Sequence, residues 1–245
     1  MRAVRSIDQQ SVDVWISKPD SIGDEALLLA YRGVLDEDER TRMGRLRFPE
    51  DRHTYLVAHA LARSALSRYE DRDPAEWRFV SNEHGRPEIH PRHRSSLRFN
   101  LSHTRRVVAC GVAIDRSIGV DVESAERRID IEEVARQQFA DDEYRALVAL
   151  PEDRRRARFL EYWTLKEAYI KARGRGLDLP LDSFSLDLSE EEPITVSFDD
   201  RAGDDPAAWQ FMQCWLSPSD SLAVAIPRRG NDLDVTIREV VPMAP

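Results

Sequence analysis

The chain has 245 residues, of which 41% are hydrophobic and 33% are charged, so it can bury a core as one large domain or as two smaller ones. Its net charge of −9 at pH 7 argues against a general nucleic-acid-binding protein. Residues 1–17 lack the apolar segment of a signal peptide, and no apolar run reaches the length of a membrane span. The two cysteines, Cys110 and Cys214, are too few for a disulfide framework. We therefore expect a cytoplasmic protein with no nucleic-acid or membrane partner.

The first part of the chain is predicted to contain a strand followed by helices. Residues 12–17 have the alternating pattern of a strand, and residues 36–70 are mostly helical in pattern. A break is expected near Phe48 and Pro49, because a proline disfavours the helical conformation of the residue before it. Together these patterns predict a strand followed by two helices.

The middle of the chain has the signals of strands and turns. Residues 78–90 are predicted to form a strand that enters a turn at Gly85. Residues 105–114 and 118–124 are predicted strands, and the short polar connection between them is typical of a hairpin. We therefore expect these last two strands to pair with each other.

Helices and then further strands complete the chain. The predicted helices cover residues 131–138, 141–149 and 152–173. The last of them is expected to end at Gly174 and Gly176, because glycine commonly terminates helices. The predicted strands that follow cover residues 194–198, 209–216, 221–227 and 233–241.

The order of these elements suggests an internal duplication. A segment that starts at Ser102 can be aligned with one that starts at Ser217, at a constant offset of about 115 residues. The alignment preserves the apolar face of one strand, whereas only the first copy has acidic residues on the other face. The sequence therefore predicts two similar halves, which we place at residues 1–115 and 116–245.

Positive charge is concentrated in two segments of this acidic chain. Seven arginines lie between residues 40 and 68 against two acidic residues, and six lie between residues 86 and 106 against one. Such clusters can bind an anion, although arginines on solvated helix faces explain them equally well. Within them, Arg42 and Arg86 are candidate phosphate ligands, and Ser102 and His103 lie at the end of a predicted strand.

Two acidic residues share one face of the predicted strand 118–124. Asp121 and Glu123 are two residues apart, so their side chains point the same way from positions roughly 6.6 Å apart along the backbone. Converging carboxylates repel each other unless a cation lies between them, and Mg²⁺ is the cation that suits oxygen ligands next to a phosphate. Taken alone, the pattern fits a half-exposed structural strand even better.

The apolar helix that includes residues 159–171 contains charged residues that need an explanation. Glu167 lies among aromatic residues, where an unpaired carboxylate would be costly, and Lys171 projects from the same side of the helix. A structural ion pair with an arginine is one explanation. The other is a third carboxylate ligand for a Mg²⁺ ion shared with Asp121 and Glu123, with a lysine beside a pyrophosphate.

Taken together, these motifs resemble the Sfp-type 4′-phosphopantetheinyl transferases, in order and spacing, from about residue 35 to residue 188. The residues that carry the resemblance are Gly85-Arg86-Pro87, Phe99-Asn100-Leu101-Ser102-His103, Gly119-Val120-Asp121-Val122-Glu123 and Trp163-Thr164-Leu165-Lys166-Glu167-Ala168-Tyr169-Ile170-Lys171. The resemblance implies a mixed α/β fold of the α+β class, with a pseudo-twofold duplication of two helix-plus-antiparallel-sheet halves. A monomer is expected, because one chain would already contain both halves of this pseudo-dimer.

The resemblance also implies an activity. Such an enzyme transfers phosphopantetheine from coenzyme A to a serine of an apo acyl or peptidyl carrier protein and releases adenosine 3′,5′-bisphosphate. The serine hydroxyl would attack the β-phosphorus, with Glu167 or a metal-bound water as the base. A Mg²⁺-dependent nuclease that uses Asp121, Glu123 and Lys171 is an alternative, and so is a non-catalytic module that binds carrier proteins.

The roles of individual residues follow from the same resemblance. Asp121, Glu123 and Glu167 would bind Mg²⁺, or Mn²⁺ in its place, and Lys171, with Lys166 as a second candidate, would face the pyrophosphate. Arg42 and His103 would bind the 3′-phosphate, with Ser102 beside them, and Gly85, Arg86 and Pro87 would line the adenine site. The sequence departs from the family at Arg86, where many relatives have lysine, and at Glu39, a position that is basic in some members.

Overall fold

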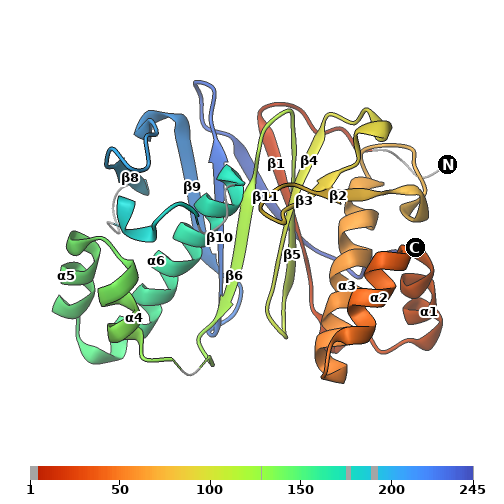
Figure 1. The fold of residues 1–245 in the computed structure, drawn as a ribbon, viewed down its shortest axis with the longest axis horizontal. Coiled ribbons are helices and arrows are strands. Elements are labelled where there is room, and N and C mark those ends of the chain that lie inside the picture. Colours follow the sequence, from red (N-terminus) through yellow and green to blue (C-terminus); the bar gives the residue numbers. More distant parts are fainter. Residues whose placement is uncertain (1–4, 128, 175–177, 189–192, 245) are drawn as a thin grey trace. The chain divides into compact units, whose positions relative to one another are not determined.

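The computed structural model describes residues 5–127, 129–174, 178–188 and 193–244. The chain divides into two compact units, the first made of Met1–Ile118 together with Leu233–Pro245 and the second of Gly119–Asp232. Each unit contains a sheet and helices, which confirms a fold of the α+β class (Figure 1).

The first unit is built around a four-stranded sheet with the order β11-β1-β5-β4. Its helices are α1 (Glu25–Val34), α2 (Glu37–Arg45) and α3 (Pro49–Leu66), and its strands are β1 (Ser11–Ser17), β2 (Phe79–Ser81), β3 (Pro87–Ile89), β4 (Leu97–His103), β5 (Val108–Ile114) and β11 (Asp234–Glu239). Strands β1, β5 and β4 are antiparallel neighbours, whereas β11 runs parallel to β1. The core lies between α3 and this sheet, where Val57 and Leu61 are fully buried in one cluster with Trp15 and Val112.

The second unit has a three-stranded antiparallel sheet with the order β6-β10-β9. Its elements are β6 (Gly119–Ser124), α4 (Ile131–Gln138), α5 (Asp141–Ala149), α6 (Glu152–Arg173), β7 (Phe184–Asp187), β8 (Thr195–Phe198), β9 (Trp209–Trp215) and β10 (Asp220–Pro227). Helix α6 packs along β6 and β10, as Figure 1 shows, and α5 contacts α6. The fully buried Leu165 and Tyr169 of α6 contribute to the core of this unit.

The three predicted helices of the second half coincide with α4, α5 and α6. Helix α6 ends as expected at Gly174, whose φ of 66° lies in the left-handed region that glycine adopts without a steric penalty. The other glycine named for this end, Gly176, lies outside the described residues. Helix α1 and strand β7 were not predicted. Among the described residues, no helix is both long enough and apolar enough to cross a membrane.

The predicted hairpin between residues 105–114 and 118–124 is wrong. Strand β5 already has a partner on each edge, β4 and β1, while β6 pairs with β10 in another sheet. Asp115 adopts a left-handed conformation, with φ of 50°, in the connection. The connection therefore carries the chain from one sheet to the other, although its composition resembles that of a tight turn.

The suggested repeat corresponds to two runs of three strands in the same order, β4–β5–β6 and β9–β10–β11. The offset of about 115 residues places β6, which covers 119–124, on β11, which covers 234–239. The third strand of each run joins the sheet of the other unit, because β11 pairs with β1. Residues 233–245, which we assigned to the second half, therefore belong to the first unit.

Candidate active site

The candidate site lies where helix α6 packs against strand β6 in the second unit. Gly119 makes this close packing possible, because a Cβ atom at that position would lie 1.8 Å from the carbonyl oxygen of Ala168 and 2.5 Å from the backbone nitrogen of Ala172. No side chain other than that of glycine fits between the two backbones. The glycine that precedes Asp121 thus brings the charged end of α6 against β6.

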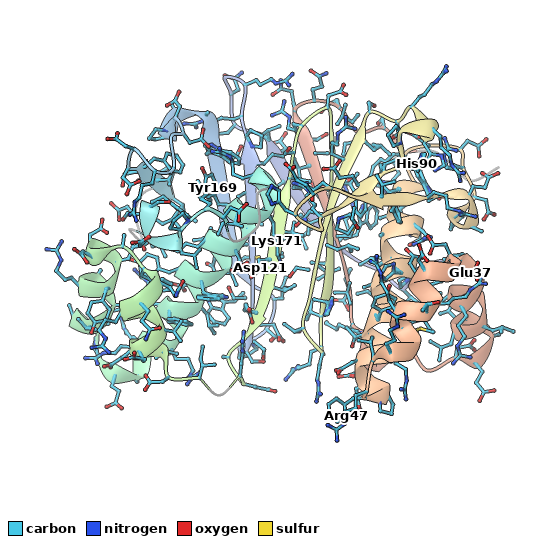
Figure 2. The ribbon with its side chains drawn as sticks, viewed as in Figure 1. Glu37, Arg47, His90, Asp121, Tyr169 and Lys171 are labelled. Carbon is cyan, nitrogen blue, oxygen red and sulfur yellow. The ribbon has the colours of Figure 1, made fainter. Side chains whose placement is uncertain are left out.

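Asp121 and Lys171 form the centre of the site. The ammonium group of Lys171 on α6 lies 2.5 Å from Oδ1 of Asp121 on β6, and Figure 2 shows the two side chains together. Asp121 is only 4% exposed, while Val120 and Val122 on either side of it are buried in the core. The acidic and apolar side chains of β6 therefore alternate as predicted, but the residues on both faces of the strand are buried. A buried carboxylate such as that of Asp121 requires a nearby cation.

Glu123 and Glu167 are the other two carboxylates of the site. Burial, and then the negative charge of Asp121, raises the pKa of both residues above its usual value. The positive charge of Lys171 acts in the opposite direction and favours a lower pKa for both glutamates. The charges of Asp121 and Lys171 thus act on both glutamates, and in opposite directions.

The chemistry of this donor set fits a hard divalent cation. Three carboxylates supply only oxygen ligands, which is the preference of Mg²⁺ and Mn²⁺, and their mutual repulsion would be relieved by bound positive charge. Within the part of the chain that the structure describes, no three potential ligands are arranged as a ready metal centre. In this structure the ammonium group of Lys171 contacts Oδ1 of Asp121.

Two residues that were not predicted as part of the site support Glu123. Trp163 on α6 acts to lower the pKa of Glu123, and Nη1 of Arg127 lies 3.5 Å from Oε1 of the Glu123 carboxylate. The position of Trp163, four residues before Glu167, was a signal in the sequence, because residues four apart lie on the same side of a helix. Trp163 and Glu123 also line a small apolar hollow of about 90 Å³ together with Ile129.

Lys166 does not belong to this site, which contradicts its predicted role at the pyrophosphate. Its side chain is fully buried, and its ammonium group lies 2.7 Å from the Glu143 carboxylate. The same group donates hydrogen bonds to the backbone oxygens of Leu181 and Phe184, at 2.8 and 2.6 Å. All three of its protons are therefore used inside the core, and Lys166 ties α6 to α5 and to the start of β7.

The predicted adenine-binding residues surround a turn in the first unit. Gly85, with φ of 81°, lies in the connection between β2 and β3, and Pro87 begins β3. The guanidinium of Arg86 turns back to the protein and donates to the backbone oxygen of Ile118 at 3.0 Å. This hydrogen bond attaches the turn to the backbone at Ile118, and burial lowers the pKa of Arg86.

The predicted phosphate-binding residues lie on two other elements of the first unit. Ser102 and His103 end strand β4, where Ser102 is buried and His103 is exposed. Arg42 is exposed in the last turn of α2. The structure therefore places these three residues in the unit that also contains Arg86, whereas the acidic cluster belongs entirely to the second unit.

Comparisons with known proteins identify the family. A model of the 4′-phosphopantetheinyl transferase superfamily matches residues 117–226, and a model of the 4′-phosphopantetheinyl transferase N-terminal region matches residues 23–113. The chain is 32% identical to 4′-phosphopantetheinyl transferase HetI of Nostoc sp., over 84% of this chain and 83% of that protein. It is 34% identical to 4′-phosphopantetheinyl transferase Sfp of Bacillus subtilis, over 69% of this chain and 74% of that protein.

The chain therefore belongs to the 4′-phosphopantetheinyl transferases. This confirms the family and the class of enzyme that the sequence motifs predicted.

Proposed function

We propose that this protein transfers the 4′-phosphopantetheine group of coenzyme A to a serine of an apo acyl or peptidyl carrier protein. The observation that carries the proposal is the cluster of Asp121, Glu123, Glu167 and Lys171 between β6 and α6. The membership of the chain in the 4′-phosphopantetheinyl transferases supports the reaction. The cluster supports a mechanism in which the negative charge of the phosphate groups is neutralised at one place.

The proposed reaction is an in-line displacement at phosphorus. The serine hydroxyl oxygen attacks the β-phosphorus of coenzyme A and forms a phosphodiester bond with it. The bond from that phosphorus to the bridging oxygen breaks, and adenosine 3′,5′-bisphosphate leaves with the bridging oxygen. Glu167 is the proposed acceptor of the serine proton, and Lys171 stabilises the charge that develops on the bridging oxygen.

The three carboxylates have a second proposed role as ligands of Mg²⁺, for which Mn²⁺ is an alternative. The bound ion would supply charge neutralisation at the diphosphate. Lys171 would then release Asp121 and contact the phosphates, so that one ammonium group serves the empty and the loaded site in turn. Trp163, which lines the same small hollow as Glu123, would help to orient the Glu123 carboxylate in both states.

The first unit contains the residues that we propose for the nucleotide end of coenzyme A. We propose Arg42 and His103 as ligands of the 3′-phosphate, and the turn at Gly85, Arg86 and Pro87 as the adenine site. We propose that the carrier protein docks next to the hollow that Glu123 and Ile129 line in the second unit. The support for this is that the apolar Ile129 lies there beside an acidic residue of the proposed site. We expect the enzyme to act as a monomer.

A single assay tests the function. The protein is mixed with coenzyme A, Mg²⁺ and an apo carrier protein, and the mass of the carrier is measured for the addition of one phosphopantetheine group. Asp121→Ala is expected to abolish transfer while sparing the fold, whereas Asp200→Ala, the same change at an exposed residue of the same unit, is expected to leave transfer unchanged. Near-normal transfer by Asp121→Ala would contradict the proposal. Cleavage of DNA in a parallel reaction would favour the nuclease instead.

A further inference from the structure

A buried ion pair joins helix α2 to helix α3 in the first unit. The Glu39 side chain on α2 is buried, and its Oε2 atom lies 2.7 Å from Nη2 of Arg63 on α3. Its other oxygen, Oε1, lies 2.8 Å from Nδ1 of His59, which is also on α3. Oε2 additionally accepts a hydrogen bond of 2.9 Å from the backbone nitrogen of Asp36, the N-cap residue that directly precedes the helix. One carboxylate thus caps α2 and attaches it to α3.

Glu39 is the main attachment of this helix. It is the only buried residue among the nine of α2, and Met43 adds a partly buried apolar contact. A helix of this length is not stable in water without tertiary contacts. Without the ion pair, α2 would therefore lose most of what fixes its position on the protein.

Arg63 extends the same connection to the neighbouring strands. Its side chain is fully buried, and its guanidinium lies 4.7 Å from the centre of the Phe79 ring on β2. The Phe79 ring in turn lies 4.9 Å from the ring of Phe99 on β4. These contacts connect α2, β2 and β4 through Arg63 of α3. Helix α2 carries Arg42, strand β2 leads into the turn at Gly85, and strand β4 ends at His103.

The charge of Arg42 acts on the same cluster. The ring of Tyr55 packs on that of His59, with the centroids 4.1 Å apart. Burial, and then the charge of Glu39, raises the pKa of Tyr55 to about 12, and Arg42 acts in the opposite direction. Arg42 lies about one helical turn after Glu39 on α2.

We propose that Glu39 is a positioning residue, which holds α2 through Arg63 and His59 so that Arg42 is fixed where it binds the 3′-phosphate of coenzyme A. The inference rests on the proposed function. It assigns a role to a buried acidic residue on the helix of a proposed phosphate ligand: this carboxylate does not contact the substrate but places the arginine that does. A fixed guanidinium loses less conformational entropy on binding a phosphate than a mobile one.

The test compares two ligands that differ only in the 3′-phosphate. Binding of coenzyme A and of 3′-dephospho-coenzyme A is measured by calorimetry for the wild-type protein and for Glu39→Gln. Glu37→Gln is the matched control, because it removes the same charge from an exposed position of the same helix. We expect Glu39→Gln to bind coenzyme A about tenfold more weakly, which corresponds to the loss of one charge-assisted contact. Its affinity for the dephosphorylated ligand is expected to remain unchanged, as are both affinities of Glu37→Gln.

Equal losses for both ligands would overturn the inference, because a merely structural role weakens both alike. An unchanged preference for coenzyme A in Glu39→Gln would overturn it as well, and so would a wild-type protein that does not distinguish the two ligands. If Glu39→Gln does not fold, the measurement is made on Glu39→Asp, which keeps the charge but withdraws the carboxylate by one methylene. Carrier modification by the wild-type protein, measured in parallel, decides the proposed function separately.

Discussion

Replacing Gly119 by alanine is expected to separate the two halves of the active site. The added Cβ atom would lie 1.8 Å from the Ala168 oxygen, a contact that must open to at least 3.0 Å, so α6 and β6 must move apart by about 1.2 Å. Both close contacts are to backbone atoms of the helix, which cannot rotate out of the way. Overpacking of this kind costs about 1–3 kcal/mol of stability.

The effect on catalysis should exceed the effect on stability. A misplacement of about 1 Å between reacting groups can lower the rate about 100-fold, and here Asp121 and Glu123 lie on one side of the displaced contact with Glu167 and Lys171 on the other. The rate of carrier modification and the melting temperature are measured for Gly119→Ala. The control is Gly33→Ala in α1, where a Cβ atom meets nothing within 4 Å. A folded Gly119→Ala variant with normal turnover would refute this account of the site.

Two further predictions follow from ionisable residues. Lys166→Met is expected to destabilise the fold by about 3–5 kcal/mol, because it leaves Glu143 as an unpaired buried charge. Lys171→Met should abolish transfer, and it should also lower the melting temperature because it leaves the buried Asp121 carboxylate without its cation. The opposite result for either lysine in parallel melting and transfer assays would contradict the roles assigned to them. Burial acts to raise the pKa of Glu39, but the hydrogen bond with His59 and the charge of Arg63 lower it to about 2, from 4.5. Because the folded-state pKa is the lower one, this carboxylate stabilises the protein by about 3 kcal/mol above pH 4.5, and the contribution is lost as the pH falls from 4.5 towards 2. Urea unfolding at several pH values should show a smaller loss in Glu39→Gln than in the wild-type protein, and equal losses would show that this carboxylate does not contribute.

Local patterns were sufficient to predict several elements of the fold. The bounds of α4, α5 and α6 follow from apolar periodicity and from the glycine that ends α6, both of which act within a few residues. The spacing of Asp121 and Glu123 on one strand, and that of Glu167 and Lys171 on one helix, were equally local. Pairing between strands could not be predicted from local patterns, since β5 and β6 have a hairpin-like connection and still join different sheets.

The sequence by itself determined which residues we propose for the chemistry, because their spacing along one strand and one helix fixes the faces they share. Only the tertiary structure decided which charges serve the site and which serve the core. Lys166 and Lys171 lie five residues apart on α6, yet the first is buried against Glu143 and the second meets Asp121. Glu39 likewise has the sequence context of an exposed helix, and its burial depends on Arg63, 24 residues further along the chain. Burial and ion pairing are set by segments distant in sequence, so no local pattern contains them.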